Sequence, residues 1–176
     1  RQMCIRDSCW IALAKMGKID ASVGIVETRL SDENIDSMEA SGQFPHKIIQ
    51  KMGEIGLFGA SFPESLGGTA AGFLAVAVIS EEISRLAPEF GYAMNMQAMT
   101  CPFTIFNWGN EDQINRFVPD LIKGKKIGMF ALTESGGGSD ASGSMKTKAT
   151  KRDDVYKING SKQWITCLLY TSPSPR

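Results

Sequence analysis

The spacing of apolar residues predicts helices in the N-terminal part of the chain. Between residues 45 and 56, apolar side chains recur at helical intervals and therefore share one face of a helix. These residues are Ile48, Ile49, Met52 and Ile55. Pro45 suits the first helical position, because its missing N–H would be unpaired there, and Gly56 is a typical helix end. The segment is predicted to be an amphipathic helix.

Three further helices are expected after a connection over residues 57–68 that contains glycine and proline. They cover residues 72–86, 89–108 and 111–122. Pro102 is expected to kink the second of them, because proline has no N–H to donate within a helix. Asn110 and Gln113 form a capping-box pattern that opens the third helix, and Gly124 closes it.

The hydrophobic period changes from helical to alternating after residue 126. Residues 127–132 form a short apolar run that is typical of a strand, and a Gly/Ser-rich loop follows over residues 133–143. Two more strand-like runs, residues 155–158 and 161–166, flank the dipeptide Asn159-Gly160. Because Asn-Gly supplies the positive φ angles of a type I′ turn, it predicts a β-hairpin at this point.

The order of these elements predicts an α+β chain. An all-helical domain is expected over residues 9–125, followed by the first strands of an antiparallel β domain over residues 126–166. The two ends, residues 1–8 and 167–176, fit no element and resemble translated sequencing-adapter sequence, so we exclude them from the fold. The chain is therefore expected to be a fragment that is shortened at both ends.

Composition and charge exclude several function classes. The chain has 176 residues, 43% of them hydrophobic, with 19 basic and 19 acidic side chains and a formal net charge of zero. This balance excludes a disordered polyelectrolyte and disfavours a nucleic-acid partner, which needs clustered Lys and Arg. The longest apolar run, residues 73–79, is too short to span a bilayer, so we expect no membrane partner.

Metal-ligating residue types are sparse and poorly spaced. The four cysteines, Cys4, Cys9, Cys101 and Cys167, show no metal-binding spacing. His46 is the only histidine of the chain, which excludes zinc motifs that need two. We therefore expect no metal site, and reduced cysteines in a cytoplasmic protein.

The segment FALTESGGGSDASG, residues 130–143, carries the most informative chemistry of the chain. Its small residues at 136–139 would let backbone N–H groups approach a phosphate closely, although a surface loop without a ligand has the same composition. The segment is not a P-loop, because the GxxxxGK[ST] pattern is absent. It is not a Rossmann fingerprint either, because the glycines do not follow GxGxxG.

Together with its neighbours, this loop resembles the acyl-CoA dehydrogenase family. ALTESGGGSD, residues 131–140, is similar to the family signature in which Thr/Ser-Glu precedes Gly-Ser-Asp. Three other segments agree in order and spacing: MGEIGLFGASFPESLGG (52–68), GNEDQINRFVPDLIKGKKIG (109–128) and INGSKQWIT (158–166). The resemblance runs over residues 34–166, about three quarters of the chain.

The resemblance implies contacts with FAD and with an acyl-CoA substrate. The implied FAD-binding residues are Phe130, Ala131, Leu132, Thr133, Gly138, Ser139, Trp164, Ile165 and Thr166. In the family, Thr133 would hydrogen-bond the isoalloxazine edge and Thr166 would lie near flavin N5. The implied substrate-binding residues are Ser139, Tyr92, Asn95, Met96 and Met99.

The implied reaction is α,β-dehydrogenation of an acyl-CoA thioester, as in fatty-acid β-oxidation. A carboxylate removes the α proton, and the β hydrogen leaves as hydride to flavin N5. In the family this carboxylate belongs to a C-terminal helical domain, so no catalytic residue is assigned here, and Glu134 and Asp140 are expected to be structural. Electron-transfer flavoprotein is the implied electron acceptor and a homotetramer the implied assembly, whereas the fragment alone is expected to be inactive and to retain FAD weakly.

The acyl group is expected to be uncharged. Residues 86–104 contain no Lys or Arg, and a distal carboxylate would need a buried cation as its partner. Two alternatives stay open. One is an acyl-CoA oxidase or nitroalkane-oxidase-like flavoenzyme that passes electrons to oxygen. The other is a non-catalytic relative that uses the scaffold for binding or assembly.

Overall fold

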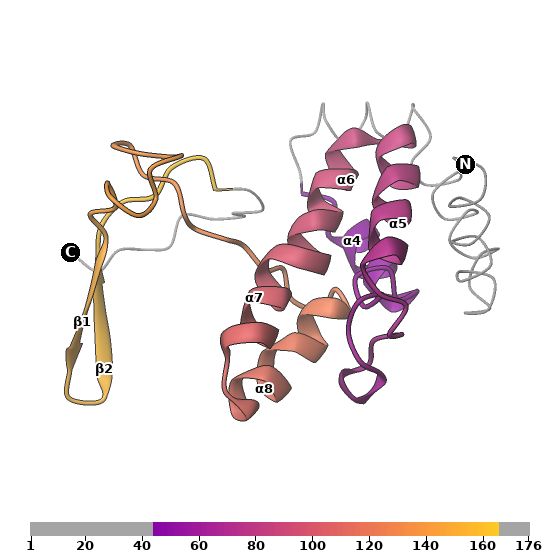
Figure 1. The fold of residues 1–176 in the computed structure, drawn as a ribbon, viewed down its shortest axis with the longest axis horizontal. Coiled ribbons are helices and arrows are strands. Elements are labelled where there is room, and N and C mark those ends of the chain that lie inside the picture. Colours follow the sequence, from indigo (N-terminus) through magenta and orange to yellow (C-terminus); the bar gives the residue numbers. More distant parts are fainter. Residues whose placement is uncertain (1–43, 166–176) are drawn as a thin grey trace. The chain divides into compact units, whose positions relative to one another are not determined.

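The computed structural model describes residues 44–165, which belong to two compact units that meet between Gly128 and Met129. Within the described part of the first unit, every element is helical (Figure 1). The elements are α4 (His46–Glu54), η1 (Glu64–Leu66), α5 (Phe73–Leu86), α6 (Pro88–Asn95), η2 (Met96–Thr100), α7 (Cys101–Trp108) and α8 (Glu111–Ile122). None of the helices over residues 44–165 has the length and apolar character that crossing a bilayer requires.

The helical unit has one apolar core, to which α4, the connection after it, α5, α6 and α8 all contribute. α5 lies beside α6, and α8 packs against α7 (Figure 1). The large side chains that are almost completely buried include Ile49, Met52, Phe58, Phe62, Val76, Met94, Val118 and Ile122. Burial of each such side chain contributes about 1.5–3 kcal/mol relative to exposure, so the apolar faces of the helices stabilise this unit.

Helix α4 has the apolar face that the spacing predicts, because Ile48, Ile49 and Met52 are buried. Its end is a Schellman motif: Gly56 has a φ of 86°, its N–H donates to Gly53 O, and the N–H of Leu57 donates to Met52 O. The prediction for the start is off by one position, since Pro45 is the N-cap residue and the helix begins at His46.

The predicted helix over residues 89–108 is interrupted earlier than expected. It begins at Pro88, and its irregularity is a π-helical turn, η2, that precedes Pro102. The N–H of Cys101 donates to Met96 O, five residues back, so the chain widens before it reaches the proline. Pro102 has no N–H to donate to the carbonyl of Ala98, so the α-helical hydrogen bond cannot form at this position. The extra residue of the π turn changes the hydrogen-bond pattern just before this point.

A buried amide ties η2 to the end of the helical unit. Gln97 is fully buried. Its Nε2 donates to Lys126 O at 3.0 Å and to Leu121 O at 3.5 Å, and its Oε1 accepts from the N–H of Gly128 at 2.6 Å. These bonds fix the backbone where the chain leaves the helical unit.

The capping box of α8 is confirmed. Asn110 Oδ1 accepts from the N–H of Gln113 at 2.8 Å, and Gln113 Oε1 accepts from the N–H of Asn110 at 3.0 Å. The helix covers residues 111–122 as predicted, and Gly124 follows it with a φ of 66°. Each side chain thus pairs one backbone donor that the first helical turn leaves open.

Removal of the Asn110 cap is expected to destabilise the helical unit. Asn110→Ala leaves the N–H of Gln113 without its partner, and the expected loss in the free energy of unfolding is about 1 kcal/mol. Urea unfolding followed by far-UV circular dichroism measures it. Asn110→Asp keeps an acceptor oxygen and should cost much less, so equal losses for the two variants would contradict a capping role.

In the second unit the described strands form one antiparallel hairpin, β1 (Lys148–Arg152) with β2 (Val155–Asn159). The register runs from Lys148 opposite Asn159 to Arg152 opposite Val155. A helical block followed by antiparallel strands confirms the predicted α+β class.

The predicted position of the hairpin turn is wrong. The chain turns at Asp153 and Asp154, and Asp153 has a φ of 51°, which aspartate tolerates better than most residues. Asn159 instead ends β2, and Gly160 lies against Thr147, where a Cβ would come 2.7 Å from Thr147 Cα. The glycine is needed for this close approach and not for the turn.

Two of the predicted strands are also wrong. Within residues 44–165, the predicted strand over residues 127–132, together with Thr133, and the described part of the predicted strand over residues 161–166 form neither a strand ladder nor a helix. An extended run becomes a strand only where another run pairs with it repeatedly. Here the two runs share one backbone hydrogen bond, from the N–H of Gln163 to Thr133 O at 2.9 Å.

Candidate functional site

The two segments predicted to contact the cofactor meet in the second unit. Besides the Gln163–Thr133 bond, the ammonium group of Lys162 donates to Leu132 O at 3.0 Å. A Cβ on Gly138 would lie 3.7 Å from Thr133 Cγ2, so the glycine loop also lies beside Thr133. The structure therefore brings the segment around Trp164 to the segment of Thr133 and Gly138, about thirty positions earlier in the sequence. Thr166 lies outside the described residues.

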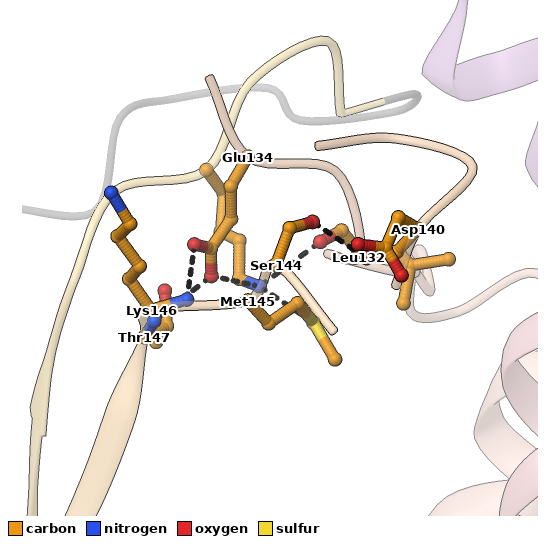
Figure 2. Close-up of polar contacts among 8 residues, drawn as sticks. Leu132, Glu134, Asp140, Ser144, Met145, Lys146 and Thr147 are labelled. Atoms are coloured by element: carbon orange, nitrogen blue, oxygen red, sulfur yellow. Dashed lines mark hydrogen bonds and ion pairs between the residues drawn. The ribbon is translucent and has the colours of Figure 1, made fainter. Parts of the chain in front are cut away.

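Glu134 connects three segments of this unit (Figure 2). Its side chain is 7% exposed. One carboxylate oxygen accepts from the N–H of Lys146 at 2.6 Å, and the other accepts from the N–H of Thr147 at 3.0 Å and from the ammonium of Lys162 at 2.9 Å. A carboxylate that is held in this way by two backbone donors and a cation has the role of a structural anchor.

The same contacts keep Glu134 ionised. The Thr147 hydroxyl beside the carboxylate, the backbone N–H of Lys146 and the ammonium of Lys162 together lower the pKa of Glu134 from 4.5 to about 2. Hydrogen bonds and positive charge favour the charged form of a carboxyl group. A carboxyl group with this pKa holds almost no proton at neutral pH, so Glu134 is a poor general base.

The second unit should lose stability in acid because of Glu134. The carboxyl pKa is lower in the folded chain, about 2, than its ordinary value of 4.5, so the unfolded chain binds more protons between these values. The stabilisation by Glu134 is fully present above pH 4.5 and is lost as the pH falls toward about 2. Thermal unfolding followed by near-UV circular dichroism across this range should show the loss in the wild-type chain. In Glu134→Gln the pH dependence should be weaker, and an identical profile would contradict the assignment.

The glycine loop is folded by its own short-range hydrogen bonds. The N–H of Gly143 donates to Asp140 Oδ1 at 3.1 Å. The Ser144 hydroxyl donates to Asp140 O at 2.5 Å (Figure 2). The backbones of Glu134 and Gly137 exchange two hydrogen bonds of 3.1 Å. Asp140 therefore fixes the loop, as expected of a structural residue, while Gly138 and Ser139 stay exposed.

Trp164 has an unusual backbone for an aromatic residue. Its φ is 57°, in the left-handed region that bulky side chains avoid, at a cost of about 1–3 kcal/mol. Its indole is 84% exposed, and Phe130 is 42% exposed. Strain of this kind persists where the surrounding contacts determine the backbone, and it is common where a ligand binds.

Four of the five residues predicted to contact substrate, Tyr92, Asn95, Met96 and Met99, lie on α6 and η2. A groove of about 490 Å³ lies in the helical unit, and its lining includes Asn95 and Met99 but not Tyr92 or Met96. The full lining is Phe73, Val76, Ala77, Ser80, Glu81, Ser84, Asn95 and Met99. Tyr92 is 53% exposed, and Ser139 belongs to the second unit. The groove is apolar toward Phe73 and polar where Ser80 and Asn95 approach each other at 3.5 Å.

Sequence reasoning missed Lys162 and Gln97. Each makes polar contacts with residues that are distant in the sequence. Lys162 bonds to Glu134, 28 positions away, and Gln97 bonds to Gly128, 31 positions away. A glutamine inside the otherwise apolar run MQAM is the signal from which a buried amide could have been predicted. No group of three metal-ligating side chains occurs within residues 44–165.

Known proteins match both the sequence and the fold. The family model "Acyl-CoA dehydrogenase, N-terminal domain" matches residues 11–125. The acyl-CoA dehydrogenase of Bacillus subtilis (strain 168) is 40% identical over 129 residues, which cover 73% of this chain and 34% of that protein. The caffeyl-CoA reductase-Etf complex subunit CarC of Acetobacterium woodii is 37% identical over 80% of this chain and 37% of its own length.

A solved structure supports the same assignment. The acyl-CoA dehydrogenase of Bacillus anthracis, solved in complex with FAD, superposes with a TM-score of 0.70 at 33% identity, covering 89% of this chain and 25% of that one. The chain thus spans about a third of the length of the curated relatives it matches. On the family model, which matches more than half of its residues, the chain belongs to the acyl-CoA dehydrogenase family.

Proposed function

We propose that this chain is part of an FAD-dependent dehydrogenase that introduces a double bond between Cα and Cβ of an acyl-CoA thioester. The observation that carries the proposal is the hydrogen bond from Gln163 N–H to Thr133 O, with the Lys162–Leu132 contact beside it. These contacts join the two segments that in this family flank a flavin. Family membership supplies the class of chemistry.

The described residues fit FAD in two respects. Trp164 and Phe130 expose aromatic faces, which suit a flat ring system. Ser139 lies exposed in a loop of small residues, where backbone N–H groups can approach a phosphate. The proposed FAD-binding residues are Phe130, Ala131, Leu132, Thr133, Gly138, Ser139, Trp164, Ile165 and Thr166. When bound, FAD supplies the acceptor for the hydride that leaves the substrate.

The chain's own residues would bind and orient the reactants. Thr133 offers a neutral donor to the cofactor, and Trp164 offers an apolar face that excludes water from one side of the ring. Neither carboxylate of the glycine loop is free to take the α proton, because Glu134 is bonded on both oxygens and Asp140 holds the loop. We therefore assign no catalytic base to this chain.

We further propose an uncharged acyl substrate. The groove with Asn95 and Met99 is lined by no Lys or Arg, and its one charged side chain, Glu81, would repel a distal carboxylate. Tyr92, Met96 and Ser139 complete the proposed substrate-binding residues. Electron-transfer flavoprotein is the proposed electron acceptor, by analogy with the Etf-complex subunit that resembles this chain. A homotetramer and a cytoplasmic location stay predictions.

A chimera tests the proposed activity. Residues 44–165 would replace the matching segment of the Bacillus subtilis acyl-CoA dehydrogenase, with the unmodified relative as control. We expect the chimera to oxidise straight-chain acyl-CoAs with electron-transfer flavoprotein as acceptor, and to leave glutaryl-CoA largely unused. Turnover with oxygen alone would favour an oxidase, and FAD binding without any turnover would favour a non-catalytic relative. A clear preference for glutaryl-CoA would contradict the uncharged substrate.

A further inference from the structure

We propose that Lys162 is a positioning residue that, together with Glu134, fixes the backbone ahead of Trp164 and so holds the indole exposed in its left-handed conformation. The positioning of Trp164 by Lys162 concerns only residues of this chain and does not depend on the proposed function. That Trp164 is held for a flavin rests on the proposed function.

The ammonium group of Lys162 has its hydrogen-bonding capacity filled. It donates to Leu132 O at 3.0 Å, to Glu134 Oε1 at 2.9 Å and to Met145 Sδ at 3.6 Å. An ammonium group has three N–H donors, so these three acceptors determine one orientation. The side chain is only 22% exposed and its partner Glu134 7%, whereas the Lys126–Asp120 pair is 57% and 37% exposed. Water therefore competes less for Lys162 than for Lys126.

The groups on either side of Lys162 are themselves held by hydrogen bonds. Glu134 is itself held by the backbone N–H groups of Lys146 and Thr147, which lie just before β1. The next residue after Lys162, Gln163, donates its N–H to Thr133 O. Two consecutive residues are therefore anchored to one segment, one through its side chain and one through its backbone.

Trp164 follows directly after these two anchors. With 84% of the indole exposed, packing of the side chain does not explain a φ of 57°. A strained backbone persists only where neighbouring contacts determine it. The anchors at Lys162 and Gln163 are the contacts that the structure offers for this purpose. The result is an exposed indole one residue after the Gln163–Thr133 bond, on a backbone that is ordered before a planar ligand binds.

The test uses the 176-residue chain without FAD. Lys162→Met keeps most of the length of the side chain but removes the ammonium, and Lys162→Arg keeps a cation. Lys126→Met removes the exposed cation of the other unit as a matched control. Amide hydrogen exchange of Gln163 is measured by NMR. Emission and acrylamide quenching of Trp164 are measured in a background with Trp10 and Trp108 changed to Phe. We expect Lys162→Met to raise the exchange rate of Gln163 about tenfold or more and to change the Trp164 emission, because a charge-assisted anchor is lost.

The controls decide between positioning and general destabilisation. Lys162→Arg should restore most of both signals, and Lys126→Met should leave both at the wild-type values. Unchanged Gln163 exchange and Trp164 emission in Lys162→Met, or equal effects of Lys126→Met, would overturn the proposal. If Lys162→Met does not fold, Lys162→Gln takes its place, because glutamine has no charge but can still donate to Leu132 O. Gln163 exchange and Trp164 emission of Lys162→Gln are then compared with the same controls. FAD titration is scored separately: failure of the wild-type segment to bind FAD in the chimera counts against the proposed function and not against the positioning role.

Discussion

Replacement of Gln97 by leucine is expected to destabilise the helical unit by about 2–4 kcal/mol, because it leaves one buried and one partly buried backbone group without partners. These groups are the N–H of Gly128 and the carbonyl of Lys126, both of which the amide now satisfies. Leucine has a similar size and suits the buried position, so the loss would come from the unpaired groups and not from a cavity. Urea unfolding followed by far-UV circular dichroism gives the change in the free energy of unfolding.

A surface amide of the same helical region provides the control for Gln97. Asn107 Nδ2 donates to Phe103 O at 2.7 Å, but this side chain is exposed and water can replace the bond. Asn107→Leu is therefore expected to change the free energy of unfolding by no more than about 0.5 kcal/mol. If Gln97→Leu lowers the free energy of unfolding as little as Asn107→Leu does, the hydrogen bonds of Gln97 do not stabilise the contact between η2 and the end of the helical unit.

Addition of a single methyl group at Gly68 is expected to have the second large effect. A Cβ there would overlap the carbonyl of Phe62 and come within 2.7 Å of Gly59 O. Both neighbours are backbone atoms of the tight connection after α4, so they cannot rotate away as a side chain would. Gly68→Ala should cost about 1–3 kcal/mol of unfolding free energy, at the upper end because the overlap is with the main chain.

Gly136 is the matched control for Gly68. A Cβ at Gly136 meets nothing within 4 Å, and its φ is not in the left-handed region. Gly136→Ala should leave stability unchanged or raise it slightly, because alanine restricts the unfolded chain. Thermal unfolding of both variants, followed by circular dichroism, measures the difference. Tolerance of alanine at Gly68 would show that the connection is looser than the structure indicates.

Local signals in the sequence were sufficient for the helices and insufficient for the strands. The buried face of α4 and the capping box of α8 depend on residues within a few positions of each other, and both predictions are confirmed. The position of the hairpin turn depends on which residues pair across it. Asn159-Gly160 has the stronger turn signal, but Gly160 is used where the chain passes close to Thr147, and the turn falls at Asp153.

In the candidate site, too, the segments could be predicted from the sequence but the contacts between them could not. Resemblance to a family identified the segments around Thr133 and Trp164, and the structure brings these segments into contact. The side chain that joins them, Lys162, was not predicted, because its partners Leu132 and Glu134 lie 30 and 28 positions away. Contacts over such separations follow from the tertiary fold, and a single sequence gives no direct signal for them.

The flavin content of the chimera with the Bacillus subtilis relative is the most direct test of the flavin assignment. We predict that the purified, folded chimera carries FAD in a stoichiometric amount and that the bound flavin quenches the emission of Trp164. A folded, colourless chimera that takes up no FAD on reconstitution, beside a yellow unmodified relative, would contradict the assignment of residues 130–133, 138–139 and 164–165 to a flavin site.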